Sequence, residues 1–295
     1  MNLCDCGTIK RIMEGAGIGF RKDLGQNFLI SSEVPIRCAE GCEANENTLI
    51  LEIGPGIGCM TDALACRFRH VVAVEIDDRL IPVLAETLAE HDNVTVHHGD
   101  IMKTDIAALL EETKARYGLP SDIPVAVCAN LPYYITTPIL MYLVECGVKF
   151  SSITVMVQAE VADRLTAKAG TAAYGAISAV LAYYGEMKRL FTVPSGCFMP
   201  QPKVNSAVVR LALYQDNPYS TKSEKVLFRT IHAAFEQRRK TLLNALSSGF
   251  SNIGKDKLAE IIEKAGLPPQ IRGEKLDITQ FVTLSNFIYE ETEIL

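Results

Sequence analysis

Between residues 48 and 160, short apolar runs alternate with segments whose apolar residues recur at helical spacing. The runs are rich in β-branched residues and predict buried strands at 48–53, 70–75, 93–98, 124–130 and 153–158. The segments between them predict helices at 59–68, 77–90, 105–117 and 137–147. Strands that alternate with helices predict an α/β fold, with a mostly parallel sheet and helices on both faces. Ligands bind such sheets beyond the carboxyl ends of the strands, so the residues there are the candidates for chemistry.

The pattern changes in the last third of the chain. Two more strand-like runs, at 174–184 and 206–214, are joined by the proline-rich stretch 193–205. After residue 215 only helical patterns follow, at 225–248, 255–266 and 278–291. We therefore expect an α/β domain over residues 1–214 and a small all-α domain over residues 215–295.

Composition and charge narrow the class of protein only slightly. Of the 295 residues, 48% are hydrophobic and 22% charged, as in an ordinary globular protein. No apolar run reaches the roughly 18 residues typical of a membrane span, and the amino-terminal segment lacks the apolar stretch of a signal peptide. We expect a cytoplasmic protein with no membrane segment. The net charge of −6 argues weakly against a nucleic acid partner, but residues 225–250 carry five basic residues against Glu236 alone.

The nine cysteines predict neither a metal centre nor a disulfide framework. No C-x-x-C pair occurs, and no histidine stands at zinc-ligand spacing from a pair of cysteines. Cys4 and Cys6 could clip a metal, but most cysteines lie in apolar stretches, where the side chain acts as a small hydrophobe. An odd number of cysteines is also more typical of a reducing compartment. We expect no bound metal.

The first predicted strand ends in a glycine-rich turn, E-x-G-x-G-x-G, formed by Glu52, Gly54, Gly56 and Gly58. Glycines at a strand-to-helix turn permit positive φ and let a ligand approach the backbone closely. The third glycine of a dinucleotide fingerprint would fall on Cys59, so a nicotinamide-type oxidoreductase is disfavoured. A plain tight turn remains the alternative interpretation of these glycines.

Carboxylates follow the next two predicted strands. Glu75 ends the second strand, where it could accept hydrogen bonds from both hydroxyls of an adenosine ribose. The alternative is a solvated acid at the start of a helix, since Asp77 and Asp78 follow and acids favour helix amino termini. Asp100 follows the third strand and could accept from an adenine amine, with a helix cap as its alternative role.

The fourth predicted strand ends at Asn130, and Leu131, Pro132 and Tyr133 follow it. These four residues give the strongest indication of function. The amine of adenine is a poor nucleophile because its lone pair is delocalised into the ring. The oxygen of Asn130 and a backbone carbonyl near Leu131–Pro132 could accept its two N–H bonds as the nitrogen becomes tetrahedral. Pro132 stiffens the loop and has no N–H of its own. Tyr133 could stack on a flipped base. The alternative is a turn followed by core tyrosines.

An ordered set of motifs resembles the ribosomal RNA adenine dimethyltransferase family. The set comprises GQNFL (25–29), EIGPGIG (52–58), VEID (74–77), GDIM (99–102), NLPYYI (130–135), FMPQPKVNSAV (198–208) and AFEQRRKTLLNAL (234–246). The resemblance implies a Rossmann-like methyltransferase domain that uses S-adenosyl-L-methionine, without a metal, and a helical RNA-binding domain. It implies that the enzyme dimethylates two neighbouring adenosines near the 3′ end of 16S ribosomal RNA. The RNA is expected to be part of a pre-30S particle, and the enzyme is expected to act as a monomer.

The resemblance also carries over site residues. For the cofactor these are Asn27, Leu29, Gly54, Glu75, Asp100 and Asn130, with the neighbours Gln26, Gly56 and Ile101. Phe198 matches an aromatic on the other face of the base, with core packing as its alternative role. The candidate contacts with RNA phosphates are Arg238, Arg239, Lys240 and Lys203. The alternative role of the first three is a solvated helix face, in which case the phosphate contacts are expected near Lys203, Arg21 and Lys22.

Two other functions remain open at this level. The sequence NLPYYITTP is closer to the small-subunit enzymes than to the antibiotic-resistance branch of the family, which acts on 23S ribosomal RNA. A non-catalytic RNA-binding assembly factor could keep the same fold. The intact glycine turn and Asn130 favour an enzyme over such a factor.

Overall fold

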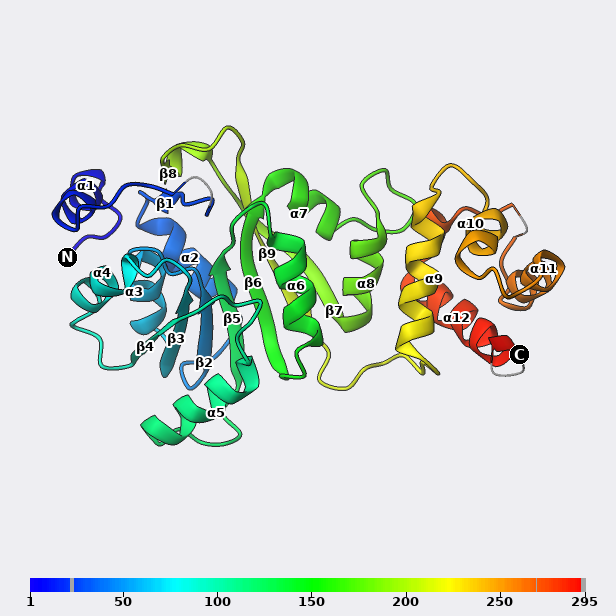
Figure 1. The fold of residues 1–295 in the computed structure, drawn as a ribbon, viewed down its shortest axis with the longest axis horizontal. Coiled ribbons are helices and arrows are strands. Elements are labelled where there is room, and N and C mark those ends of the chain that lie inside the picture. Colours follow the sequence, from blue (N-terminus) through cyan, green and yellow to red (C-terminus); the bar gives the residue numbers. More distant parts are fainter. Residues whose placement is uncertain (22–23, 269, 293–295) are drawn as a thin grey trace. The chain divides into compact units, whose positions relative to one another are not determined.

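The computed structural model describes residues 1–21, 24–268 and 270–292 (Figure 1). By internal contacts the chain forms two compact units. The first comprises Met1–Ala162 with Lys188–Gln215, and the second comprises Asp163–Met187 with Asp216–Leu295. Residues 163–187 thus group with the helices of the second unit, whereas the sequence assigned them to the first domain. The domain assignment 1–214 and 215–295 remains a prediction.

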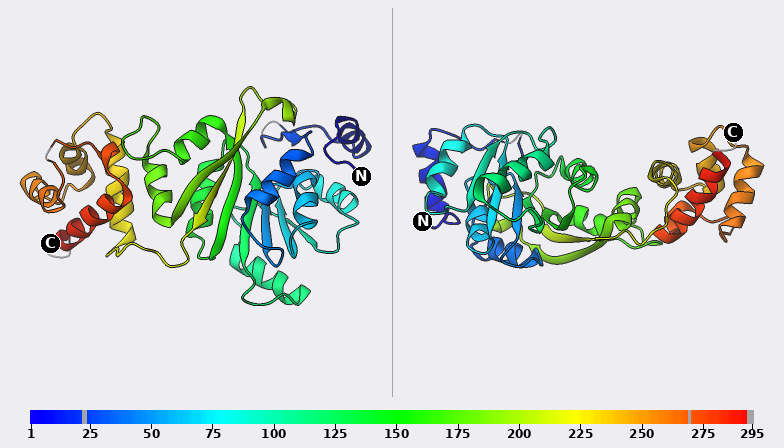
Figure 2. Two further views of the ribbon diagram at one scale, coloured as in Figure 1. Left: turned by 180° about the vertical axis from the view of Figure 1, so that it is seen from behind. Right: turned by 90° about the horizontal axis from the view of Figure 1, so that it is seen from below.

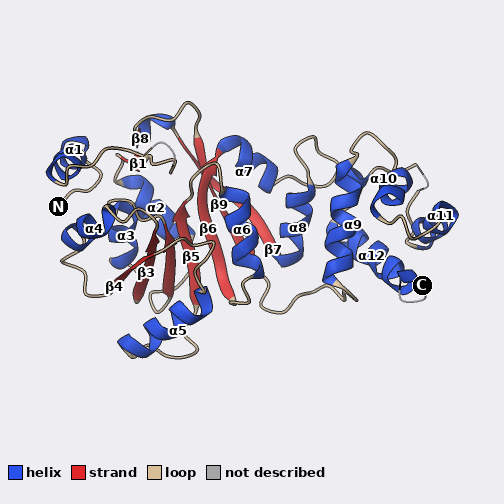
Figure 3. Cartoon of the chain, in the orientation of Figure 1, coloured by secondary structure: helices blue, strands red, loops and turns tan. Residues whose placement is uncertain are grey.

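A seven-stranded sheet has the order β4-β3-β2-β5-β6-β9-β7 (Figure 3), and all of it except the first three residues of β7 belongs to the first unit. Neighbouring strands from β4 to β6 are parallel, and β9 pairs antiparallel with β6. The strands are β2 (Leu49–Ile53), β3 (His70–Glu75), β4 (Val94–His98), β5 (Val125–Asn130), β6 (Phe150–Gln158), β7 (Gly185–Val193) and β9 (Ser206–Leu213). The mostly parallel sheet confirms the predicted α/β fold class. Strand β7 was not predicted, because its charged residues interrupt the apolar pattern.

Helices cover both faces of this sheet (Figures 1 and 2). They are α2 (Glu33–Gly41), α3 (Cys59–Ala65), α4 (Leu80–Thr87), α5 (Ile106–Tyr117), α6 (Thr136–Glu145) and α7 (Ala159–Leu165). Side chains of β2 alternate between the faces, and Ile50 packs with Cys38 of α2 and Leu64 of α3 in one buried cluster. Among the helices that the structure describes, none has the length and apolar character needed to cross a membrane.

A second, two-stranded sheet lies beside the first. Strand β1 (Phe28–Leu29) pairs antiparallel with β8 (Phe198–Met199), with Phe28 opposite Met199 and Leu29 opposite Phe198. The backbone N–H of Ile30 extends the ladder to the carbonyl of Cys197 at 2.8 Å. The motif GQNFL, which alone reads as a loop, is therefore fixed by a segment about 170 residues further along the chain.

The first twenty residues contain a helix that the sequence analysis did not predict. Helix α1 (Cys6–Gly15) begins where the Asp5 carboxylate accepts from the backbone N–H of Thr8 at 2.8 Å. Just before it, Cys4 is disulfide-bonded to Cys59, and their Cα atoms are 6.2 Å apart. This pair departs from the expectation that the cysteines are unpaired, and no local pattern reveals it, because 55 residues separate its members.

The second unit is helical, as expected for the carboxyl-terminal region. Its helices are α8 (Ala176–Tyr184), α9 (Glu224–Glu236), α10 (Leu242–Gly249), α11 (Lys255–Lys264) and α12 (Ile278–Thr292). Two predictions are wrong here. The run 174–184 is a helix rather than a strand, because an almost continuous apolar run fits either element and its alanines favour a helix. The predicted helix 225–248 is broken after Glu236, where Gln237 leaves the helical conformation.

Candidate active site

A pocket opens at the carboxyl ends of β2, β3 and β5, where the sequence placed the site. It is formed entirely by the first unit. The structure brings most of the candidate cofactor and base residues to its wall, namely Gln26, Asn27, Leu29, Gly54, Gly56, Glu75, Asn130, Leu131, Pro132 and Tyr133. Side chains that are up to about 100 residues apart in sequence therefore face one cavity.

The glycine turn leads from β2 into α3 along one wall of the pocket. Gly54 and Gly56 have φ angles of 68° and 62°, in the left-handed region that favours glycine. A Cβ on Gly56 would lie 2.9 Å from the ring of Phe28, so a side chain has no room here. The turn presents bare backbone to the pocket, which permits close approach of a ligand.

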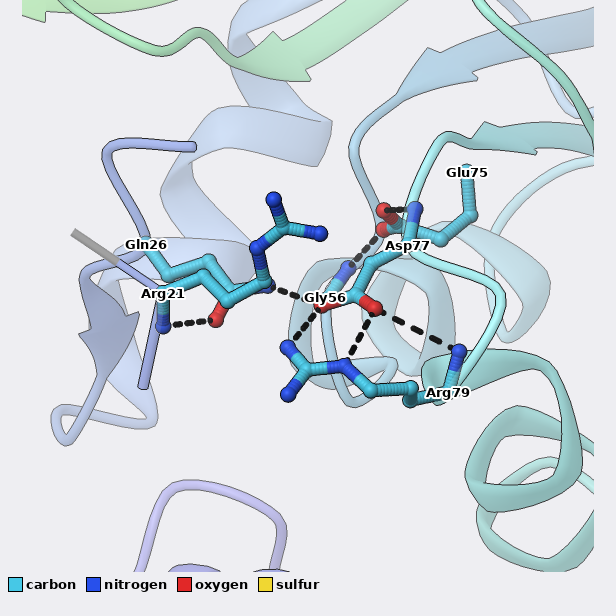
Figure 4. A network of polar contacts seen from close by, with 6 residues as sticks. All are labelled: Arg21, Gln26, Gly56, Glu75, Asp77 and Arg79. Carbon is cyan, nitrogen blue, oxygen red and sulfur yellow. Dashed lines mark hydrogen bonds and ion pairs between the residues drawn. The ribbon is translucent and has the colours of Figure 1, made fainter. Parts of the chain in front are cut away.

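Glu75, at the end of β3, is held by backbone donors (Figure 4). One carboxylate oxygen accepts from the N–H of Gly56 at 3.1 Å, and the other accepts from the N–H of Asp77 at 2.8 Å. Burial raises the pKa of Glu75, and these backbone hydrogen bonds partly oppose the rise. The carboxylate is thus fixed in direction and joins the glycine turn to the strand end.

Asp77 anchors a network that the sequence analysis did not find (Figure 4). Its carboxylate accepts from the Arg79 guanidinium at 2.6 and 2.8 Å and from the Gln26 amide at 2.8 Å. The side-chain oxygen of Gln26 accepts from the backbone N–H of Arg21 at 2.8 Å. The hydrogen bonds from Arg79 lower the pKa of Asp77. Gln26 therefore ties the segment before β1 to the end of β3.

Asn130 ends β5, and its amide is oriented by a hydrogen bond to the segment before β1. The Nδ2 atom of Asn130 donates to the carbonyl of Asn27 at 3.3 Å, while Nδ2 of Asn27 donates to the carbonyl of Gly25 at 2.9 Å. Because the nitrogen side of the Asn130 amide is engaged, its Oδ1 atom is the group left to accept a hydrogen bond.

The backbone after Asn130 is fixed at several points. Leu131 is buried, and its N–H donates to the carbonyl of Met156 at 3.2 Å. The carbonyl of Pro132 accepts from the N–H of Ile135 and from the hydroxyl of Thr136, both at 3.2 Å. Since the Pro132 carbonyl is engaged at the start of α6, the carbonyl of Leu131 is the better candidate acceptor for a substrate amine.

Tyr133 is held by a residue that the sequence analysis did not single out. Its hydroxyl lies 2.7 Å from that of Ser206, at the start of β9. Burial raises the pKa of the Tyr133 phenol. The next residue, Tyr134, is 63% exposed and lies beside Gly25. One tyrosine is therefore fixed in the pocket wall and the other is available at the surface.

Three candidate residues do not border this pocket. Asp100 accepts from the N–H of Met102 at 3.0 Å and so caps its own turn, while Ile101 is buried. Phe198 is 2% exposed and packs in the cluster that contains Leu29. Asp100 therefore has the contacts of a capping residue, and Phe198 and Ile101 have those of buried core residues. Their roles in binding cofactor or base remain predictions.

Glu52, which the sequence marks only as part of the glycine motif, lies in the wall of the pocket. Its side chain is 1% exposed, and its Oε2 atom has no hydrogen-bond partner among the described residues. Burial, with the nearby Glu75 charge, raises the pKa of Glu52 to about 8. The sequence signal is an acid within a strand whose other residues are apolar.

Replacing Glu52 with glutamine should make the stability of the ligand-free protein less dependent on pH. Between the ordinary carboxyl pKa and about 8, the folded protein keeps a proton that the unfolded chain releases, so the free energy of unfolding falls as pH rises. The fall approaches about 1.4 kcal/mol per pH unit in this window. Urea unfolding of parent and Glu52→Gln at pH 5, 6, 7 and 8 measures the difference. Parallel profiles would show that Glu52 titrates normally.

The candidate phosphate contacts fall into both units. Arg238, Arg239 and Lys240 lie in the connection between α9 and α10, although the sequence predicts one continuous helix over residues 225–248. Arg238 donates to the carbonyls of Ala172 and Tyr174, at 3.1 and 3.0 Å, and lies 3.3 Å from the Glu274 carboxylate. It therefore has a structural role within the second unit. Lys203 and Arg21 belong to the first unit, and Lys22 lies outside the described residues.

Comparisons with known proteins agree with the sequence motifs. The model of the family described as ribosomal RNA adenine dimethylase matches residues 17–290. The protein named ribosomal RNA small subunit methyltransferase A from Streptococcus gordonii is 43% identical over 293 residues, covering 99% of each chain. Its namesake from Lachnoclostridium phytofermentans is 47% identical over 274 residues, covering 92% of each chain.

Solved structures show the same fold at lower identity. A dimethyladenosine transferase from Plasmodium falciparum aligns with a TM-score of 0.72 and 21% identity, covering 90% of this chain and 98% of that one. The 23S rRNA methyltransferase ErmE aligns with a TM-score of 0.69 and 24% identity, covering 89% of this chain and all of that one. At such identities the likeness concerns the fold alone.

Proposed function

This chain belongs to the ribosomal RNA adenine dimethylase family, and from that premise we propose which adenosines it modifies and how. It is an S-adenosylmethionine-dependent ribosomal RNA adenine methyltransferase. We propose that it places two methyls on the N6 amine of each of two adjacent adenosines near the 3′ end of 16S ribosomal RNA. The substrate is a pre-30S particle, and the enzyme acts as a cytoplasmic monomer.

The pocket residues fit S-adenosylmethionine. The cofactor carries a positive sulfonium and an ammonium group, and the pocket wall holds the carboxyl groups of Glu52 and Glu75, whose ionised forms a bound cation favours. The unpartnered oxygen of Glu52 is an acceptor for a cationic donor. Glu75 is oriented by Gly56 and Asp77 with acceptor capacity remaining for ribose hydroxyls. The bare backbone at Gly54 and Gly56 allows the cofactor to lie against the turn.

The observation that carries the proposed mechanism is the orientation of the Asn130 amide. Its nitrogen donates to the carbonyl of Asn27, which turns its oxygen toward a substrate amine. With the carbonyl of Leu131 it offers two acceptors for the two N–H bonds of adenine N6. These acceptors favour the tetrahedral nitrogen over the planar one, so they stabilise the transition state more than the ground state.

The other residues position the base. Tyr133, tied to Ser206, presents its ring to a base that has left its stack. The bound cofactor supplies a methyl on sulfur that is already activated toward a nucleophile, so the protein needs no strong base or metal for this step. Alignment of the amine with that methyl is the main task of the pocket. The amine can lose its proton to water after transfer.

The proposed substrate is tested with small ribosomal subunits that lack dimethyladenosine. Incubation with the parent protein and methyl-labelled cofactor should place label on two neighbouring adenosines near the 3′ end of 16S RNA, seen by mass spectrometry of nuclease fragments. Protein with Asn130→Ala is the matched control. Label that appears instead in 23S RNA, or at adenosines elsewhere in 16S RNA, would contradict the proposed substrate.

Neutralising Arg239 and Lys240 together should weaken RNA binding and flatten its dependence on salt. Each lost phosphate contact reduces the slope of log affinity against log salt by somewhat less than one, so the double change should remove up to about two units. Arg238 is left intact because its hydrogen bonds to the carbonyls of Ala172 and Tyr174 give it a structural role within the second unit.

The matched control changes Lys255 and Lys264 of α11 to glutamine, which removes the same charge elsewhere in the second unit. Filter binding of small subunits over a range of salt measures both slopes. Cofactor affinity should stay constant, because the cofactor pocket lies in the first unit. Equal slopes for the two double variants would move the phosphate contacts to other residues, with Lys203 and Arg21 the next candidates.

A further inference from the structure

Three potential metal ligands of different chemistry gather away from the cofactor pocket. They are Asp62 of α3, Cys66 at the carboxyl end of that helix, and His91 in the connection between α4 and β4. One carboxylate oxygen, one sulfur and one imidazole nitrogen lie within 4.8 Å of one another. None of the three residues borders the cofactor pocket, so the methyltransferase activity does not account for the group.

The local structure holds these side chains in place. Asp62 and Cys66 are four residues apart, so they project from the same face of the helix, and the N–H of Cys66 donates to the carbonyl of Asp62 at 3.1 Å. Asn93 fastens the neighbouring connection to the end of α3, since its amide donates to the carbonyls of Ala65 and Phe68 at 2.9 and 3.1 Å. The backbone N–H of His91 itself donates to the carbonyl of Leu88 at 2.9 Å, so His91 is positioned by contacts that do not involve its ring.

The contacts inside the group are compatible with an ion between the side chains. The Nε2 atom of His91 lies 2.7 Å from Asp62 Oδ1, and the side chain of Asp62 is 49% exposed. A small rotation of this exposed carboxylate opens space between oxygen, nitrogen and sulfur. Asp62 and Cys66 also border a surface hollow formed with residues of the amino-terminal segment, which gives an ion a path from solvent.

The ligand types select the ion. A thiolate and an imidazole are poor ligands for Mg²⁺ or Ca²⁺ and good ligands for Zn²⁺, which accepts sulfur, nitrogen and carboxylate oxygen in tetrahedral sites. We propose that Asp62, Cys66 and His91 bind one Zn²⁺ ion, with water as the fourth ligand. On binding, the Cys66 thiol gives its proton to solvent and the Asp62–His91 hydrogen bond is replaced by two bonds to the metal. The bound ion cross-links the end of α3 to the connection between α4 and β4.

Cobalt substitution tests the site directly, because a cysteine thiolate bound to Co²⁺ gives an ultraviolet charge-transfer band. Full-length protein is titrated with Co²⁺ under anaerobic conditions, which keep the free thiols reduced without cleaving the disulfide between Cys4 and Cys59. We expect one Co²⁺ per chain with the charge-transfer band, and displacement of the cobalt by Zn²⁺. Cys66→Ser should abolish the band, and His91→Ala should weaken binding about tenfold or more.

Cys6→Ser is the matched control, because Cys6 is also an exposed free cysteine of the first unit. It should keep the band and the affinity of the parent. A second readout does not depend on colour: Zn²⁺ should raise the midpoint of thermal unfolding of the parent and of Cys6→Ser, but not of Cys66→Ser. Absence of saturable binding by the parent, or a band that persists in Cys66→Ser, would overturn the proposal.

Discussion

Replacing Asn130 with alanine is expected to lower the rate of methyl transfer in a single turnover by about a hundredfold or more. The variant loses the oriented oxygen that accepts from the adenine amine, and this hydrogen bond strengthens only as the nitrogen becomes tetrahedral. RNA affinity should change much less than rate, because the ground-state amine can bond to water instead. Rapid mixing of the enzyme–cofactor complex with small subunits, with the enzyme in excess, measures the chemical step.

Asn130→Asp separates the two roles of this amide. The aspartate keeps an acceptor oxygen but cannot donate to the Asn27 carbonyl, which Asn130 reaches at 3.3 Å. Its rate should fall between those of the parent and of Asn130→Ala. Calorimetric titration with cofactor checks that each variant keeps a folded pocket. A parental single-turnover rate in Asn130→Ala would show that activation of the amine lies elsewhere.

Replacing Glu75 with alanine should weaken cofactor binding by about tenfold to a few hundredfold. The lost contacts are charge-assisted hydrogen bonds to the ribose hydroxyls, at roughly 1.5–3 kcal/mol each before water replaces the carboxylate. The effect also includes loss of support for the glycine turn, because the N–H of Gly56 donates to this side chain. Calorimetric titration of the cofactor measures the loss.

Glu75→Gln distinguishes ligand contacts from support of the turn. The glutamine keeps the length of the side chain and one oxygen, but it replaces the second acceptor by a donor facing either Gly56 or Asp77. Its affinity should fall less than that of Glu75→Ala. Thermal unfolding without cofactor reports the structural part of each change. Unaltered cofactor affinity in a folded Glu75→Ala protein would remove this residue from the site.

The sequence was most informative where one residue type satisfies a local requirement. The glycine turn follows one predicted strand and Asn130 ends another, and a parallel sheet brings such strand ends to one edge. Local patterns therefore suffice to predict that Gly54, Glu75 and Asn130 border the same pocket, as they do. The order of the motifs then identified the family, although the pattern of apolar residues alone could not.

The sequence was least informative where a partner lies far along the chain. Gln26 and Asp77 are 51 residues apart, and neither carries a local sign that the other is its partner. The same is true of Tyr133 with Ser206, which are 73 residues apart. The prediction for helix α8 was wrong for a different reason, because an apolar run without polar interruptions shows no helical or strand period. Such features depend on tertiary packing, which local patterns do not encode.

The pairing of β1 with β8 couples the segment that lines the cofactor pocket to Phe198, the residue that the family resemblance places against the base. Leu29 lies opposite Phe198 in that small sheet, so if Phe198 moves to contact an incoming base, that movement shifts the segment that lines the cofactor pocket. Linkage requires that RNA and cofactor then change each other's affinity by the same factor, which titration of each ligand in the presence of the other can measure. Each adenosine receives more than one methyl, so spent cofactor must leave between transfers. If the bound cofactor raises the affinity for RNA, each release of spent cofactor weakens the binding of RNA. Partly methylated subunits should then accumulate as free intermediates early in the reaction.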